Sequence, residues 1–343
     1  MKICGYLSDG RAVHAITLTD GRLSCEILSY GGILRTLLVP DRDGKLRDVV
    51  LGFDTAESYF PFRTFFGALV GRFANRIGGS SFTLNGIRYD LPANDGPNQL
   101  HSGPDGFDCQ LWDIVAESEN SVTLKLISPD GTGGFPGNLE MQATYTLRDA
   151  ELTIEYEAVS DADTLCSPTN HAYFNLSGQE SGSVEQQVIQ LFASHYTPGD
   201  SGLIPTGEIA AVDGTPMDLR QPTPIGAHID EDFPALNGPG GYDHNWVIDG
   251  TPGEFRLAAT AYSPESGIVM HTRTDRPGVQ FYTGNGLGMG ITGKDGAKYV
   301  KRSGFCLETQ AFPDAPNHDN FPSAVLRAGE KFYSKTSYSF ELK

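Results

Sequence analysis

The sequence predicts an all-β protein, built as a large antiparallel β-sandwich with an open groove. Three observations lead to this fold class. Apolar and polar residues alternate with a period of two in several segments, as they do along half-buried strands. Gly, Asp, Asn and Pro separate these segments, and patterns of long amphipathic helices are missing. The alternation alone fits an antiparallel sandwich or barrel; in a sandwich, a strongly curved sheet would offer a concave face to a ligand.

Three strands are predicted in the middle of the chain, over residues 121–128, 140–149 and 151–160. In each of them every second residue is apolar, which places the apolar side chains on one face. These inward residues are Val122, Leu124 and Leu126 in the first strand, Met141, Ala143, Tyr145 and Leu147 in the second, and Leu152, Ile154, Tyr156 and Ala158 in the third.

Turn signals mark where the predicted strands end. They are rich in Gly, Asp, Asn and Pro, which favour turn conformations. These signals lie at residues 40–45, 84–87, 129–134 and 148–151. Residues 54–60 predict one short helix, for which Asp54 or Thr55 would supply the N-cap.

Length and composition indicate how the chain is organised. The 343 residues show no break in composition, and the 41 glycines and 21 prolines are spread along the sequence rather than gathered in a linker. All-β folds often reach this length as one unit. We therefore expect residues 1–343 to form a single domain.

The formal net charge of -18 restricts the partners. Phosphates of nucleic acids and anionic membrane surfaces need Lys and Arg, so neither is an expected partner. A neutral small molecule fits this charge better. The charge says little about oligomeric state, for which we expect a monomer or a weak homodimer.

Cysteine usage and the N-terminus bear on localisation. The five cysteines are scattered and form no CxxC pair, which disfavours a disulfide framework or a zinc knuckle. The first residues lack the apolar core of a signal peptide, and no apolar run is long enough to span a bilayer. The expected location is the cytoplasm.

Two segments place reactive groups in apolar surroundings. As a strand, SPTNHAYFNL (167–176) would put His171, Tyr173 and Asn175 on one face, while the other face would be ordinary core. Glu308 follows the apolar residues 305–307. A carboxylate buried there would have a raised pKa and could serve as a base, although strand alternation also permits it to face solvent. His171 could likewise be a core or surface histidine.

Other segments add polar groups, and one combination raises the question of a metal. Further candidates are Asn75 and Arg76 in GRFANRI (71–77), His101 in NQLHSGPDGF (98–107), Asp243 in GYDHNWVID (241–249), and Gln280 and Tyr282 in GVQFYTGN (278–285). His101 and His171 with Asp243 or Glu308 could in principle hold a metal ion. No P-loop, GxGxxG, GxSxG or HExxH motif is present.

In their order along the chain, these motifs resemble those of the aldose 1-epimerases, also called galactose mutarotases. The motifs are GRFANRI, NQLHSGPDGFD, PTNHAYFNL, GYDHNWVID, GVQFYTGN and ETQAFPDAPN (308–317). The resemblance runs from YLSDGRAVHAITL (6–18) to FYSKTSYSFELK (332–343), nearly the whole chain. It implies a large antiparallel β-sandwich with an open groove, and conversion between the α and β anomers of a hexose through its open-chain aldehyde.

The resemblance also implies the roles of particular residues. Glu308 would be the general base and His171 the general acid, and neither a metal nor a cofactor would be needed. Ring opening requires that the C1 hydroxyl lose a proton while the ring oxygen gains one, which a carboxylate and an imidazole on opposite sides can achieve. The residues implied to bind the sugar are Asn75, Arg76, His101, Asp243 and Gln280.

Two departures from the family pattern lie in one loop. The family usually has HGG where this chain has His101-Ser102-Gly103, and DCQLW (108–112) lacks the basic residue often found there. Both bear on sugar specificity more than on the chemistry.

Three other functions fit parts of the pattern. A glycoside hydrolase would use Asp243 and Glu308 as paired carboxylates. A sugar-binding module without catalysis would use Asp243 and Gln280, with Trp246 or Tyr282 as a stacking aromatic. An epimerase-like enzyme for an anionic sugar is disfavoured by the acidic composition, although one arginine in the groove could suffice.

Overall fold

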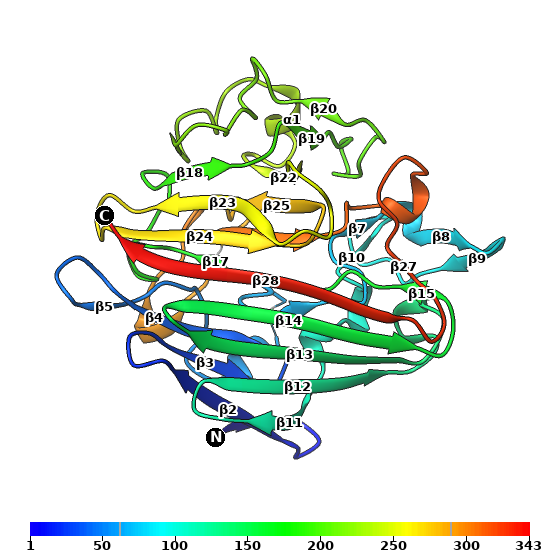
Figure 1. Ribbon diagram of the computed structural model, residues 1–343, viewed down its shortest axis with the longest axis horizontal. Coiled ribbons are helices and arrows are strands. Elements are labelled where there is room, and N and C mark those ends of the chain that lie inside the picture. Colours follow the sequence, from blue (N-terminus) through cyan, green and yellow to red (C-terminus); the bar gives the residue numbers. More distant parts are fainter. Residues whose placement is uncertain (62, 289) are drawn as a thin grey trace.

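A nine-stranded antiparallel sheet forms one side of the molecule in the computed structural model, which describes residues 1–61, 63–288 and 290–343 (Figure 1). All neighbouring strands in it run antiparallel. In spatial order the strands are β11 (Asp113–Glu117), β12 (Ser121–Ser128), β13 (Leu139–Arg148), β14 (Glu151–Ser160), β28 (Lys331–Leu342), β24 (Ile268–Thr274), β23 (Arg256–Tyr262), β18 (Val188–Leu191) and β21 (Thr223–Pro224).

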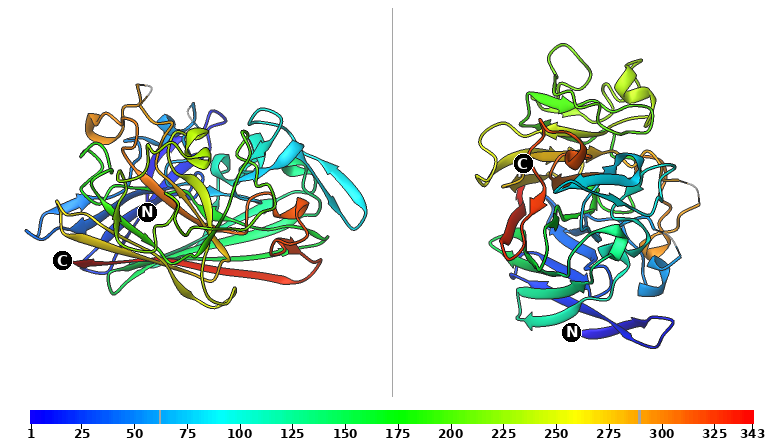
Figure 2. Two further views of the ribbon diagram at one scale, coloured as in Figure 1. Left: turned by 90° about the horizontal axis from the view of Figure 1, so that it is seen from above. Right: turned by 90° about the vertical axis from the view of Figure 1, so that its right-hand side faces the viewer.

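Two further sheets lie against this one. The six-stranded sheet has the order β17 (Tyr173–Phe174), β26 (Phe305–Gln310), β25 (Gly278–Tyr282), β22 (Asp243–Val247), β19 (His195–Thr197) and β20 (Ala210–Ala211). The five-stranded sheet runs β1 (Lys2–Tyr6), β2 (Ala12–Thr19), β3 (Ser24–Leu28), β4 (Leu34–Pro40) and β5 (Leu46–Asp48). Seen from above, the long strands form one layer at the bottom of the view, and most loops lie above this layer (Figure 2, left).

Short elements complete the described part of the chain. Four two-stranded ribbons pair β6 (Leu69–Val70) with β16 (Thr169–Asn170), β7 (Arg76–Ile77) with β10 (Gln99–Leu100), β8 (Ser81–Leu84) with β9 (Ile87–Asp90), and β15 (Thr164–Leu165) with β27 (Val325–Leu326). Helical turns are α1 (Pro234–Asn237), η1 (Ala56–Tyr59), η2 (Gly78–Ser80), η3 (Gly103–Asp105), η4 (Phe107–Cys109), η5 (Thr132–Gly134), η6 (Lys294–Gly296) and η7 (Ala315–Asn317). Among the helices described, none has the length and apolar character that a membrane crossing needs.

The core lies between the sheets, and it confirms the predicted β-sandwich. One buried apolar cluster joins Tyr145 and Ile154 of the nine-stranded sheet, Leu37 of the five-stranded sheet, and Phe281 and Phe305 of the six-stranded sheet. The three strands predicted in the middle of the chain are β12, β13 and β14, with ends within one residue of the prediction. All their predicted inward residues are buried, because one face of the sheet packs on this core.

The predicted helix over residues 54–60 is a single 3-10 turn, η1, and its predicted cap is absent. Thr55 occupies the N-cap position, but its side chain makes no capping bond. Its hydroxyl lies 3.0 Å from the Ser58 hydroxyl instead, and Asp54 Oδ1 accepts the backbone N–H of Asp295 at 3.1 Å. Both candidate caps are therefore engaged elsewhere.

The predicted continuous strand over residues 167–176 is wrong. The segment forms β16 and β17, which pair with different partners, β6 and β26. The break follows from Asn170, whose side-chain oxygen accepts the N–H of Ala172 at 3.0 Å, while its amide donates to the Gly67 carbonyl at 2.7 Å. This local bond takes the backbone out of the ladder, and His171 lies at the break.

Candidate active site

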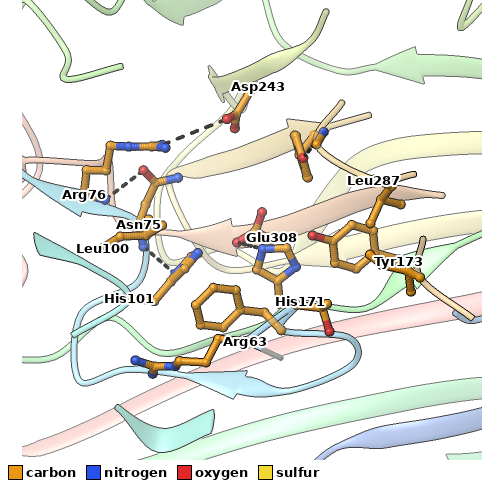
Figure 3. Close-up of a pocket in the computed structure, with 15 residues that line it drawn as sticks. Arg63, Asn75, Arg76, Leu100, His101, His171, Tyr173, Asp243, Leu287 and Glu308 are labelled. Carbon is orange, nitrogen blue, oxygen red and sulfur yellow. Dashed lines mark hydrogen bonds and ion pairs between the residues drawn. The ribbon is translucent and has the colours of Figure 1, made fainter. Parts of the chain in front are cut away.

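Six of the seven predicted site residues meet in one cavity of about 300 Å³. This volume is at the low end for small-molecule sites and suits a single sugar ring. Arg76, Asn75, His101 and Asp243 lie on one side, Glu308 and His171 in the middle, and Tyr173 and Leu287 on the other side (Figure 3). The cavity is lined by Arg63, Thr64, Phe65, Asn75, Arg76, Leu100, His101, His171, Tyr173, Asp243, Tyr282, Gly286, Leu287, Ile291 and Glu308.

Glu308 is a buried carboxyl group, and one of its oxygens has no hydrogen-bond partner among the described residues. It lies on β26, a strand whose residues are all buried, and only 2% of its surface is exposed. Its Oε2 atom makes no hydrogen bond to any described residue. Burial raises the pKa of Glu308 well above its ordinary value, Asp243 raises it further, and Arg76 opposes the shift. The interpretation as a solvent-facing strand residue is therefore wrong.

His171 lies between two aromatic rings and next to Glu308. The Phe65 and Tyr173 rings lie roughly parallel to its imidazole, at interplanar angles of 20° and 22° and centroid distances of 5.7 and 5.0 Å. Nε2 is 3.6 Å from Glu308 Oε2, and Nδ1 is 3.5 Å from the sulfur of Cys306. Burial lowers the pKa of His171 to about 4. The imidazole next to the carboxyl group is therefore buried and neutral near pH 7.

His101 is held in one tautomer by the backbone of Asn75. The Asn75 N–H donates to His101 Nδ1 at 3.1 Å, and the His101 N–H donates to the Asn75 carbonyl at 3.0 Å. Because Nδ1 accepts, the proton of the neutral ring is on Nε2. Burial lowers the pKa of His101 well below its ordinary value, helped by His171, Arg76 and Arg63. His101 is therefore a neutral hydrogen-bond donor.

Polar contacts hold Arg76 and Asp243, on the same side of the cavity as His101 (Figure 3). Arg76 Nε donates to Asp95 at 2.7 Å, and Arg76 Nη1 is 4.0 Å from Asp243 Oδ2. The Gln280 amide donates to Asp243 Oδ1 at 2.7 Å. Gln280 is buried and is not among the lining residues; it stands behind Asp243 on the neighbouring strand.

Comparisons with known proteins show the family. A family model described as aldose 1-epimerase matches residues 14–339. The galactose mutarotase of Bos taurus is 44% identical over 330 residues, covering 96% of this chain and 94% of that protein. The chain belongs to the aldose 1-epimerase family.

Two further relatives align with this chain over almost the full length of both proteins. The galactose mutarotase of Homo sapiens is 44% identical over 335 residues, with 98% of this chain and 96% of that protein covered. The crystal structure of an aldose epimerase homologue from C. elegans superimposes with a TM-score of 0.89 at 30% identity, over 96% of this chain and 99% of that chain. Fold and chain length therefore agree with those of the family.

A metal ion is geometrically conceivable in this epimerase but chemically disfavoured. One ligand atom from each of His101, His171 and Glu308 lies within 4.8 Å of the others. A metal would need a lone pair on His101 Nε2, yet the N–H of Asn75 already occupies Nδ1 and leaves the ring proton on Nε2. The set therefore fits a hydrogen-bonding site better than a metal site.

Sequence reasoning missed several side chains of the epimerase cavity, among them Arg63 and Phe65. Phe65 belongs to an apolar run that resembles core, so no signal marked it. Arg63 donates to both carboxylate oxygens of Asp108 at 2.7 to 3.0 Å and to the Gly103 carbonyl at 2.7 Å. Arg63 thus brings a cation to the loop 108–112, which lacks the basic residue common in the family. Asp108 was the available signal in the sequence, because a carboxylate that becomes buried needs a cationic partner.

The structure locates four residues whose roles the sequence did not decide. Tyr173 lines the cavity, whereas Asn175 is fully buried and bonds only to backbone groups and Gln187. The Ser102 hydroxyl accepts the N–H of Phe73 at 2.9 Å and donates to its carbonyl at 3.1 Å, so it anchors the loop that carries His101. Trp246 is buried with 0% exposure, which rules it out as a stacking surface.

Proposed function

We propose that the protein interconverts the α and β anomers of an aldohexose such as galactose or glucose, with Glu308 as general base and His171 as general acid. One observation carries this proposal. The unpartnered Oε2 of Glu308 lies 3.6 Å from His171 Nε2 in a cavity sized for one sugar ring. A C1–O5 unit placed against this pair would meet a proton acceptor and a proton donor together.

The proton inventory of the pair fits ring opening. Burial raises the pKa of Glu308 well above its ordinary value and lowers that of His171 to about 4. Between these limits the pair shares one proton, which rests on Glu308. Transfer of that proton to His171 Nε2 creates the reactive form, a carboxylate beside an imidazolium.

Ring opening returns the pair to its resting state, and ring closure regenerates the carboxylate and the imidazolium. The carboxylate of Glu308 takes the proton of O1, and the imidazolium of His171 gives its proton to O5 as the C1–O5 bond breaks. The products are the open-chain aldehyde, a protonated Glu308 and a neutral His171. Rotation about C1–C2 exposes the other face of the aldehyde, and reversal of the transfers closes the ring as the other anomer.

The remaining predicted residues would bind and orient the sugar. We assign Asn75, Arg76, His101 and Asp243 to direct contacts with hydroxyl groups or the ring oxygen, because all four line the cavity. His101 would donate from Nε2, and Asp243 would accept from sugar hydroxyls. Gln280 is assigned to the same end of the site, where it bonds Asp243.

Substitution of Glu308 tests the proposed chemistry. Glu308→Gln retains size and polarity but removes the base, so the enzymatic rate of mutarotation should fall by at least about 10²–10⁴-fold, the usual contribution of a general base. Polarimetry of freshly dissolved α-galactose and α-glucose measures this rate. Glu140→Gln, on the half-exposed face of β13 and outside the cavity, is the matched control. A Glu308→Gln rate close to that of the unsubstituted enzyme would contradict the assignment.

We also infer the setting in which the enzyme works. All five cysteines are free, which fits a reducing cytoplasm. The net charge of -18 fits a free monosaccharide as the partner rather than nucleic acid or a membrane, and the proposed acid–base chemistry needs no cofactor. We propose a monomer or weak homodimer, and light scattering across a range of protein concentrations tests this. A stable higher oligomer would contradict it.

A further inference from the structure

Both nitrogens of the His171 ring face the same strand. Cys306 and Glu308 lie two residues apart on β26, so their side chains point to the same face. The Cys306 sulfur is 3.5 Å from Nδ1, and Glu308 Oε2 is 3.6 Å from Nε2. Strand β17 fixes this arrangement, because Tyr173 pairs with Cys306 in the ladder and also stacks on the imidazole.

The resting protonation of the pair decides what the sulfur does. A neutral imidazole carries one proton, on one nitrogen only. In the resting form Glu308 is the protonated member, and Nε2, 3.6 Å away, must be bare to receive its proton. The ring proton is therefore on Nδ1, which lies 3.5 Å from the Cys306 sulfur.

The thiol suits this task because it stays neutral. Burial raises the pKa of Cys306 well above its ordinary value, and the nearby Glu308 and Asp243 raise it further. A thiolate at this place would pull the Nδ1 proton away and stabilise the imidazolium too strongly. A neutral sulfur is only a weak acceptor, so it holds the proton on Nδ1 and leaves the imidazolium acidic.

We propose that Cys306 is a positioning residue for His171: its sulfur accepts the Nδ1–H and reserves Nε2 for proton exchange with Glu308 and the sugar ring oxygen. This inference rests on the proposed roles of Glu308 and His171. Cys306 does not line the cavity, so it acts only through the imidazole. The titratable groups packed around that ring are Glu308 and Cys306 from β26, Tyr173 from β17, and His101 from the loop after β10.

The first test needs no substitution at Cys306. The enzyme labelled with 15N-histidine is examined by long-range proton–nitrogen NMR near neutral pH, and the His171 signals are assigned by their loss in His171→Asn. The inference expects a protonated Nδ1 and a bare Nε2 in the ligand-free enzyme. A proton resting on Nε2 would overturn it, whatever the substituted enzymes do.

Substitutions then ask whether the sulfur is the cause. Cys306→Ala removes the acceptor, so the Nε2–H tautomer should become populated and kcat should fall about threefold to tenfold, the scale of one hydrogen bond. KM should stay within about twofold, because the sugar does not touch this side chain. Cys306→Ser restores an acceptor and should recover both the tautomer and most of kcat. Cys166→Ala, at another buried thiol that is not among the residues lining the cavity, is the matched control.

The outcomes separate this inference from the proposed function. An unchanged tautomer in Cys306→Ala overturns the inference, as does equal loss of kcat in the Ala and Ser variants. Neither result affects the role of Glu308, which is tested by Glu308→Gln alone. Conversely, an active Glu308→Gln enzyme would remove the proposed base while leaving the measured tautomer of His171 as it is.

Discussion

The two ends of the cavity are built on opposite principles. At the acid–base end, Glu308 and His171 lie 3.6 Å apart, and burial raises the pKa of Glu308 and lowers that of His171, which favours the neutral form of each. At the binding end, Asp243 accepts a 2.7 Å hydrogen bond from Gln280, and Arg76 makes one of 2.7 Å to Asp95. Burial sets the protonation states of Glu308 and His171 at the acid–base end. Hydrogen bonds fix the side-chain positions of Asp243 and Arg76 at the binding end.

This contrast separates two kinds of expected defect. A change at the acid–base end removes a proton acceptor or donor that is needed only while bonds break, so it should lower kcat. A change at the binding end removes a contact that is present before and during the reaction, so it should mainly raise KM. Glu308→Gln is expected to show the largest effect, and the following changes are expected to show progressively smaller ones.

His171→Asn should come next in size. The amide retains a polar side chain of about the right length but cannot donate a proton to the ring oxygen, so kcat should fall by about 10²–10⁴-fold with little change in KM. Polarimetry with α-galactose measures both constants. His195→Asn, on an exposed position of β19, is the control. A large rise in KM with kcat preserved would place His171 at the binding end instead.

The pH dependence of kcat should follow the single proton of the pair. As pH falls through about 4, His171 takes up a second proton and Glu308 can no longer act as a base, so the rate should drop. As pH rises through the raised pKa of Glu308, the pair loses its only proton and has no acid, so the rate should drop again. Beyond either limit the loss is about tenfold per pH unit. Polarimetric rates across this range give a bell-shaped profile, and a rate that keeps rising in alkali would contradict the shared proton.

Asp243→Asn should lower activity less than His171→Asn does, and it should affect both the binding of sugar and the pKa of Glu308. Loss of a charged acceptor for sugar hydroxyls should lower kcat/KM by about 10–100-fold, mostly through KM. Because Asp243 raises the pKa of Glu308, the alkaline limit of the kcat profile should also move to lower pH. Asp113→Asn, on the exposed edge of β11, controls for a change of net charge. An unchanged alkaline limit would mean that the two ends are electrically independent.

Sequence reasoning found the parts of the molecule in which local chemistry is sufficient. The strands β12 to β14 were predictable because each buries one face, and Glu308 stood out because a carboxylate follows three apolar residues. The break at His171 was not predictable, because it depends on a single side-chain bond from Asn170 to Ala172. That residues 1–343 form one domain stays a prediction.

Other parts of the site depend on contacts between distant segments. Phe65 and Cys306 each look like core residues in their own stretch of sequence. Only the fold brings both to the His171 imidazole, where Phe65 stacks on the ring and the Cys306 sulfur lies 3.5 Å from Nδ1. Arg63 and Asp108 are 45 residues apart, so no local pattern joins them. Asn175 looked equivalent to Tyr173 by strand alternation, but β17 ends at Phe174 and Asn175 is fully buried. Alternation therefore predicted the buried faces of β12 to β14 correctly but not the place of Asn175.

The smallest effect is expected at Gln280, which the sequence placed among the sugar-binding residues and which stands behind Asp243. Gln280→Leu retains volume but removes the 2.7 Å hydrogen bond to Asp243 Oδ1, so KM should rise about twofold to tenfold while kcat stays within about twofold. The double variant with Asp243→Asn decides how Gln280 acts. If it acts only by orienting Asp243, the double variant should have the KM of Asp243→Asn alone. If the two effects multiply instead, Gln280 contacts the sugar itself, and the division between a dry acid–base end and a hydrogen-bonded binding end must extend one residue deeper.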